Sequence, residues 1–113
     1  MSATTVEEYL DGLSPATRET VDEVRRRVRV LAPHTGETIS YAILAITLDG
    51  RPALHVGGWK RHVGIYPVPR FDGPLEEAVA PYRAATDTVR FPVGRPVPDV
   101  LEPVVAALLE RAG

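Results

Sequence analysis

The 113-residue chain contains no cysteine. Disulfide bonds, thiolate metal sites and cysteine nucleophiles are therefore excluded, and the composition is compatible with a reducing cytosol. A signal-peptide pattern is also missing, because the polar residues 1–5 lead directly into an acidic amphipathic segment. The longest apolar stretch, residues 39–48, is about half of the roughly 20 residues that a membrane-spanning helix needs. We therefore expect a cytoplasmic protein with no membrane partner.

Sequence motifs of enzymes are missing as well. The chain has no G-x-S-x-G nucleophile elbow, no H-E-x-x-H zinc motif, no P-loop and no G-x-G-x-x-G dinucleotide fingerprint. Ser14 is better explained as a helix cap and Ser40 as a strand residue than as nucleophiles, since no base is predicted beside either hydroxyl. We therefore expect that the protein is not an enzyme.

An excess of positive charge is absent, since the formal net charge is -2. No overall field would attract nucleic acid, and the arginines of residues 25–29 share their predicted helix with Glu19, Asp22 and Glu23, a mixture of charges typical of a solvated helix face. We expect no nucleic-acid partner. With 44% hydrophobic and 25% charged residues, the chain has the composition of one globular domain that spans residues 1–113.

Two helices are predicted near the N-terminus. Thr4 and Thr5 each precede a glutamate by three residues, so overlapping capping boxes predict a short helix that ends near Gly12. Ser14 followed by proline predicts the start of a long helix that Pro33 ends. The apolar stripe of the long helix consists of Val21, Val24, Val28 and Leu31.

Two more helices are predicted in the second half of the chain. Residues 75–79 form a short helical pattern before Pro81. Asp99 and Glu102 have the spacing of a cap for a last helix with an apolar face.

Strands are predicted between these two pairs of helices and before the last helix. The β-branched stretch 39–48 reads as one strand, and Asp49-Gly50 is a favoured two-residue hairpin turn. The returning strand contains Gly57-Gly58, which predicts a bulge, and further strands are predicted at residues 62–66 and 88–91. The order ααβββαβα predicts an α+β fold, with an antiparallel sheet of about four strands and helices packed on one face.

Strand alternation assigns the side chains of the sheet to two faces. Val63 and Ile65 point toward the helices, whereas His62 and Tyr66 point away from them. By the same alternation, Tyr41, His55 and Trp59 join the face without helices. This ring cluster has two interpretations: an exposed sheet face or homodimer interface, or a shallow pocket for a small anionic or planar molecule. The candidate ligand-binding residues are Tyr41, Trp59, Lys60, His62, Tyr66 and Arg90.

Several short motifs occur in one order along most of the chain. They are Val6-Glu7-Glu8-Tyr9-Leu10, Ile39-Ser40-Tyr41, His62-Val63-Gly64-Ile65-Tyr66-Pro67, Val89-Arg90-Phe91-Pro92 and Pro96-Val97-Pro98. In this order and spacing, from about Val6 to Leu109, the chain resembles the YdhG-like family. That family is a bacterial domain of unknown function, some members of which are described as frataxin-like intracellular iron chaperones.

The chain departs from the family pattern in two places. Where the family usually reads I-S-Y-G-M-P, residues 39–44 read I-S-Y-A-I-L. Where it usually reads Y-K-T-S-K-G-T, residues 82–88 read Y-R-A-A-T-D-T, so Thr86 stands in place of a lysine. If that lysine holds an anionic group, Arg83 replaces its charge only if the guanidinium points the same way.

The resemblance implies iron as a candidate cofactor or cargo. Hard iron cations need several clustered oxygen ligands, and the first helix carries Glu7, Glu8 and Asp11 three and four residues apart. These three are the candidate metal ligands, with a second set at Glu19, Asp22 and Glu23; a solvated helix face is the alternative for both sets. His55 and His62 would chelate a metal only if the hairpin places them opposite one another.

Two functions are therefore expected from the sequence. The first is a small non-enzymatic intracellular binding protein that resembles the iron chaperones of the YdhG-like family, with a ligand that the residues do not identify. The alternative is a protein-protein interaction module or homodimer that uses the aromatic sheet face.

Overall fold

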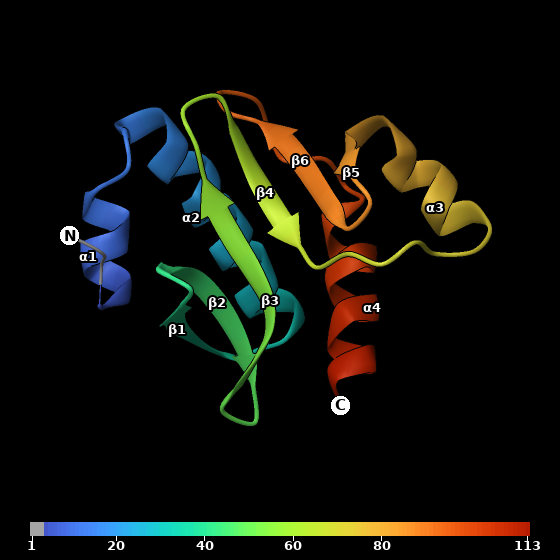
Figure 1. Cartoon of the computed structure of the whole chain (residues 1–113), viewed down its shortest axis with the longest axis horizontal. Helices are drawn as coiled ribbons and strands as arrows, with labels where there is room; N and C mark the ends of the chain where they lie inside the picture. The colour runs from blue at the N-terminus through green and yellow to red at the C-terminus, as the bar shows by residue number, and fades with distance from the viewer. Residues whose placement is uncertain (1–3) are drawn as a thin grey trace.

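The computed structural model describes residues 4–113 as a mixed sheet-and-helix fold (Figure 1). In chain order the elements are α1 (Val6–Asp11), α2 (Pro15–Leu31), β1 (Gly36–Ser40), β2 (Ile43–Leu48), β3 (Arg51–Gly58), β4 (His62–Tyr66), α3 (Pro74–Val79), the 3-10 helix η1 (Ala80–Tyr82), β5 (Arg83–Ala85), β6 (Thr88–Pro92) and α4 (Leu101–Ala112). Within residues 4–113 the six strands form one antiparallel sheet in the order β1-β2-β3-β4-β6-β5. The predicted α+β class is confirmed, and the prediction of about four strands is wrong.

The first extra strand comes from a turn inside the stretch predicted as one strand. Tyr41 and Ala42 both have positive φ, 54° and 64°, and reverse the chain between β1 and β2. Neither residue is the glycine or asparagine that usually marks such a turn, so the sequence carries no signal for it. The next turn, Asp49-Gly50, has φ of 53° and 80° and is confirmed as a hairpin turn.

The second extra strand, β5, has three residues and pairs with β6 at the edge of the sheet. Its sequence, Arg83-Ala84-Ala85, lacks the β-branched or aromatic residues by which strands are recognised. β5 is a strand because its backbone pairs with that of β6.

The helix starts near the N-terminus are confirmed in detail. The Thr5 hydroxyl accepts a bond from the Glu8 N–H at 3.1 Å, and the Glu8 carboxylate accepts one from that hydroxyl at 3.1 Å. Ser14 caps α2 by accepting a bond from the Thr17 N–H at 3.4 Å. The predicted Asp99–Glu102 cap of α4 is wrong: α4 has Val100 at its N-cap with no side-chain bond, because the Glu102 carboxylate is bound to Arg27 at 2.7 Å.

The predicted bulge at Gly57-Gly58 is also wrong, since both residues pair in register with β4. Shifts in pairing lie between Ile46 and Thr47 and between Arg83 and Ala85 instead. Close packing leaves no room for a side chain at either glycine. A Cβ at Gly57 would lie 2.5 Å from the ring of Trp59, and one at Gly58 would lie 2.8 Å from the Thr17 methyl group.

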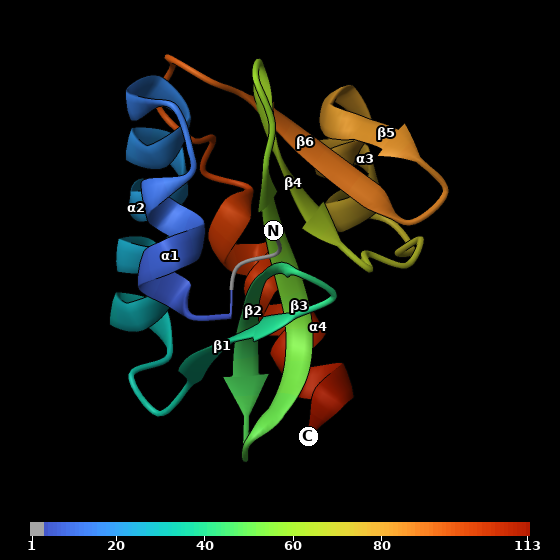
Figure 2. The same ribbon diagram turned by 60° about the vertical axis from the view of Figure 1, so that its left-hand side comes forward.

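The sheet has one face that α1, α2 and α4 cover (Figure 2) and one that these helices leave open. Leu54, Val56, Val63 and Ile65 are fully buried against the helices, which confirms the predicted alternation. Leu31 does not belong to the buried stripe, because its side chain, at the end of α2, is 40% exposed. None of the helices in residues 4–113 is long and apolar enough to cross a membrane.

Candidate functional site

A row of rings crosses the open face of the sheet. Tyr41 lies 5.7 Å from His55 between ring centroids, and His55 stacks on Tyr66 at 5.5 Å. Tyr66 lies 6.5 Å from Trp59, which stacks on His62 at 5.4 Å. The structure thus brings together the five rings that strand alternation predicts on this face, although Tyr41 reaches it from a turn.

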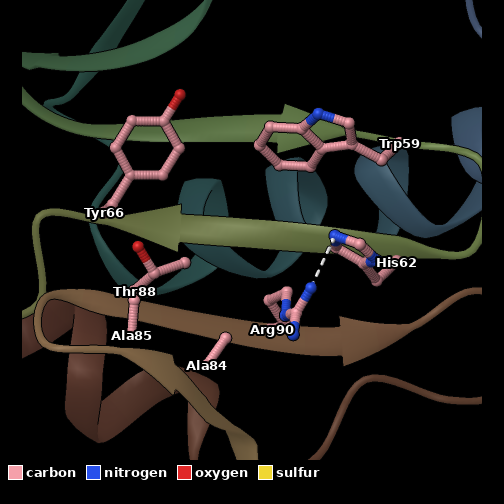
Figure 3. Close-up of a pocket in the computed structure, with 7 residues that line it drawn as sticks. All are labelled: Trp59, His62, Tyr66, Ala84, Ala85, Thr88 and Arg90. Carbon is pink, nitrogen blue, oxygen red and sulfur yellow. Dashed lines mark hydrogen bonds between the residues drawn. The ribbon is translucent and has the colours of Figure 1, made fainter.

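One end of this row borders a groove of about 380 Å³. Its lining residues are Trp59, His62, Tyr66, Ala84, Ala85, Thr88 and Arg90. Figure 3 shows these side chains on β4, β5, β6 and the segment after β3, with the indole and the phenol on one side and the alanines on the other. We call this set the aromatic groove.

The indole of Trp59 is held by the backbone on which it lies. Gly57 of β3 and Gly64 of β4 are paired across the two strands. A Cβ at Gly57 would lie 2.5 Å from the ring, and a Cβ at Gly64 would lie 3.0 Å from it. The backbone N–H of Trp59 donates to the carbonyl of His62 at 2.9 Å, and the backbone carbonyl of Trp59 accepts from the hydroxyl of Thr17 at 2.8 Å. The ring therefore has a fixed seat, yet Trp59 remains 45% exposed.

Arg90 and His62 lie side by side at the groove. The Arg90 guanidinium donates to Nε2 of His62 at 3.3 Å, the contact drawn as a dashed line in Figure 3. An acceptor imidazole nitrogen is unprotonated, so the remaining ring proton belongs on Nδ1. Burial, followed by the charge of Arg90, lowers the pKa of His62 below its usual value. The groove thus contains one permanent cation next to a neutral imidazole.

No carboxylate lines the aromatic groove. Within residues 4–113 the Arg90 side chain makes its one hydrogen bond with His62 and has no acidic partner. At the opposite end, burial raises the pKa of the Tyr66 phenol, which is therefore a neutral hydroxyl at physiological pH. The electrostatic balance of the groove is positive, in contrast to the net charge of the chain.

His55 is the buried member of the row of rings. It is 9% exposed, and neither ring nitrogen has a hydrogen-bond partner within the part of the chain that the structure describes. The rings of Tyr41 and Tyr66 cover it. A buried polar group without a partner costs about 1–3 kcal/mol.

The predicted ligand-binding residues divide into two groups. Trp59, His62, Tyr66 and Arg90 line the groove, whereas Tyr41 and Lys60 lie outside it. Tyr41 is 90% exposed, and Lys60 is an exposed residue of the loop before β4.

Three lining residues were missed by sequence reasoning: Ala84, Ala85 and Thr88. The alanines carry no chemical signal and lie on the unpredicted β5. Thr88 had a usable signal, because it stands two residues before Arg90 on a predicted strand and so shares its face.

The candidate metal ligands on α1 are engaged separately. The Glu8 carboxylate accepts bonds from Thr4 and Thr5, and bonds from these side chains lower its pKa. Asp11 pairs with Arg18 at 2.8 Å, and Glu7 lies 3.8 Å from the same guanidinium. Among residues 4–113 no group of three or more histidine, aspartate or glutamate side chains is placed to hold a metal ion. Glu7, Glu8 and Asp11 are therefore not brought together as a metal site.

The other metal candidates are dispersed as well. Asp22 pairs with Arg25 at 2.8 Å, and Glu23 with Arg27 at 2.9 Å. His55 pairs with Tyr66 and His62 with Pro92 across the strands, so the two histidines are not opposite one another.

The guanidinium of Arg83, the candidate substitute for the lysine of the family pattern, is engaged within the protein. The Arg83 side chain is 8% exposed and is bound to the Glu76 carboxylate at 2.8 Å and to the carbonyls of Val68, Pro69 and Thr86. This guanidinium ties the segment before α3 to β5 and is not available to a ligand.

Comparison with known proteins gives a match in structure. No family model matches the chain, and no curated protein sequence matches it. A crystal structure of a DUF1801 family protein, YdhG from Bacillus subtilis, is similar with a TM-score of 0.77 and 23% sequence identity, over 96% of this chain and 91% of that chain. At this identity the match shows a shared fold, and it confirms at that level the resemblance that the sequence motifs indicate.

Proposed function

We propose that this chain, which shares the fold of a YdhG protein, is a small non-enzymatic protein that binds a small organic molecule in the aromatic groove. The observation that carries the proposal is the position of the Trp59 ring, which lies on two glycines and is partly exposed. An indole fixed on paired glycines and left 45% exposed is a ready stacking surface at the border of a groove.

The size of the groove is compatible with this function. Its volume of about 380 Å³ falls in the range of about 300–1,000 Å³ that is usual for small-molecule sites. Its lining combines aromatic and methyl surface with a few polar groups, a combination that such sites share.

The chemistry of the lining favours binding over catalysis. The only side-chain hydroxyls of the lining belong to Tyr66 and Thr88. A hydroxyl nucleophile needs a neighbouring base, but Nε2 of His62 already accepts the hydrogen bond of Arg90. No lining residue is therefore arranged to activate either hydroxyl.

Nuclear magnetic resonance with ¹⁵N-labelled protein tests the proposal. Trp59 is the only tryptophan, so its indole N–H gives one unambiguous signal. In a screen of planar fragments, we expect binders to shift this signal together with the amides of Thr88 and Arg90. Fragments that shift amides only on the helical side, or no binders at all, would refute the function.

A homodimer through the ring row is the second candidate function. It is favoured by the exposed ring of Tyr41, which extends the row to a part of the sheet that the groove does not reach. Tyrosine and tryptophan are enriched at interfaces. Sedimentation of a Tyr41→Ser variant tests this: the candidate requires a dimer that the substitution dissociates, and a monomeric native chain rejects it.

Iron handling, which the family resemblance implies, has a weaker basis in this chain, because the carboxylates proposed for it are engaged in a helix cap and ion pairs. Anaerobic calorimetry with Fe(II) tests it directly. Heat that disappears when Glu7, Glu8 and Asp11 are replaced by alanine would support that role.

A further inference from the structure

The aromatic groove carries enough chemistry to define the class of its ligand, an inference that rests on the proposed function. Two features indicate the class of ligand: the positive charge of the lining and the exposed flat ring of Trp59.

The charge of the lining selects an anion. Arg90 presents a planar guanidinium with five N–H donors, and one hydrogen bond to His62 leaves most of them free. No acidic residue of the lining competes for these donors. A carboxylate matches the planar donor fork of arginine with two parallel hydrogen bonds.

The number of cations limits the charge of the ligand. Arg90 is the single permanent cation of the lining, and the pKa of its neighbour His62 is lowered. Phosphate groups carry more charge and are usually held by several donors or by a helix N-terminus. A monoanion suits this groove better than a phosphate ester.

The exposed flat ring of Trp59 favours a flat molecule. Gly64 lies on β4 between His62 and Tyr66 and pairs with Arg90, so no side chain rises between the flanking residues. A Cβ at Gly64 would lie 3.0 Å from the Trp59 ring and 3.7 Å from the Thr88 methyl group. Gly64 is buried and is not part of the lining, so the missing side chain gives room to the indole, which is 45% exposed at the border of the groove.

We propose that the aromatic groove binds a planar aromatic carboxylate. Its carboxylate accepts hydrogen bonds from Arg90, and its ring stacks on the exposed surface of the Trp59 indole. The methyl groups of Ala84 and Ala85 close the other side, and the Tyr66 phenol lies at the far end.

Three matched probes test the ligand class: naphthalene-2-carboxylate, its neutral amide 2-naphthamide, and cyclohexanecarboxylate, an anion without a flat ring. Titrations are followed by the indole signal of Trp59. We expect the aromatic carboxylate to bind at least about tenfold more tightly than either of the others, because each of them lacks one of the two interactions.

Variants locate the charge interaction. Arg90→Gln is expected to weaken naphthalene-2-carboxylate about tenfold and to leave 2-naphthamide unchanged. Arg61→Gln is the matched control, because Arg61 is an exposed cation of the loop before β4 and does not line the groove. It should alter neither affinity.

The outcomes separate the two proposals. If the carboxylate and the amide bind equally, or Arg90→Gln weakens both alike, the ligand class is wrong while a small-molecule groove stands. If cyclohexanecarboxylate equals the aromatic acid, the stacking claim is wrong. If none of the three probes moves the indole signal and the fragment screen is also negative, both proposals fall.

Discussion

At the scale of a single residue, we predict that His62 couples ligand binding to pH. In the free protein, burial and the charge of Arg90 lower the pKa of its imidazole. The groups that face it are the indole of Trp59 and the guanidinium of Arg90, with Tyr66 further along the same strand and no carboxylate in the lining. A bound carboxylate adds an attractive negative charge, so the pKa of His62 rises and binding takes up a proton.

The affinity for naphthalene-2-carboxylate is therefore predicted to increase as the pH falls from about 7.5 to about 5.5, a range in which the ligand, with a pKa near that of other carboxylic acids at about 4, stays ionised. Calorimetry in buffers of different ionisation enthalpy measures the proton uptake. His62→Gln should bind with an affinity that does not change over this range. An affinity of the native chain that is flat, or that falls on acidification, contradicts the coupling.

His55 affects stability at the same scale. Its two nitrogens are buried without partners, and its ring stacks on Tyr66. His55→Phe keeps the stacking and removes both unsatisfied atoms, while the exposed ring of Tyr41 has room to move for the larger side chain. We predict that the free energy of unfolding rises by about 1 kcal/mol in urea denaturation.

The matched control for that variant is His34→Phe, since His34 lies exposed in the loop before β1. Its effect should stay within about 0.5 kcal/mol. A clear loss of stability in His55→Phe alone would mean that the His55 nitrogens have a favourable partner in solution.

At the scale of elements, Gly57 of β3 and Gly64 of β4 make room for the Trp59 ring, which matters more for the groove than for the stability of the sheet. Gly64 has ordinary strand geometry, so alanine there costs nothing in backbone conformation and recovers about 0.5–1 kcal/mol of strand propensity. The added Cβ would lie 3.0 Å from the indole, so the ring that borders the groove would have to move.

Gly64→Ala is therefore predicted to keep the free energy of unfolding within about 1 kcal/mol of the native value while weakening naphthalene-2-carboxylate at least about tenfold. The indole signal of Trp59 should shift even without ligand. Gly12→Ala is the control, because a Cβ there would approach nothing closer than 3.5 Å. Undiminished affinity in Gly64→Ala would show that binding does not depend on the position of the Trp59 ring.

Arg27 links α2 to α4 and to the loop between β6 and α4. Its guanidinium donates to Glu23 at 2.9 Å, to Glu102 at 2.7 Å and to the carbonyls of Val97 and Pro98 at 2.6 Å and 3.1 Å. The side chain is 20% exposed. Removing it leaves two carboxylates and two carbonyls without this partner.

We predict that Arg27→Met lowers the free energy of unfolding by about 2 kcal/mol, less than for a fully buried pair because solvent screens part of the interaction. Arg26→Met, at an exposed position of the same helix, should change it by no more than about 0.5 kcal/mol. Equal effects of the two substitutions in urea denaturation would contradict the linking role.

The ion pair between Arg27 and Glu102 also predicts that the free energy of unfolding depends on pH in the acid range. The hydrogen bond from Arg27 lowers the pKa of Glu102 in the folded chain, so the stability from this pair is present above the unfolded pKa of about 4.3 and is lost as the pH falls through the lower folded pKa. In Arg27→Met this part of the acid loss should disappear.

At the scale of the whole molecule, the parts that local patterns determine were predictable. Alternation places Val63 and Ile65 under the helices and Trp59 and Tyr66 on the open face, because a strand has only two sides. Helix starts at Thr5 and Ser14 follow from capping chemistry that is also local.

The unpredicted parts depend on contacts between distant segments. Tyr41 and Ala42 adopt positive φ because β1 pairs with β2, and Arg83–Ala85 becomes a strand because β6 lies beside it. The aromatic residues of the groove, Trp59, His62 and Tyr66, could therefore be predicted from the sequence, whereas Ala84 and Ala85 on β5 could not.

The central claim is that a flat anion lies between Trp59 and Arg90 on the open face of the sheet. A crystal structure of the chain with naphthalene-2-carboxylate tests it most directly. We predict the ring within about 4 Å of the indole and a carboxylate oxygen within about 3.2 Å of the Arg90 guanidinium. A ligand bound elsewhere, or a second protein molecule covering Trp59 in place of the ligand, would contradict it.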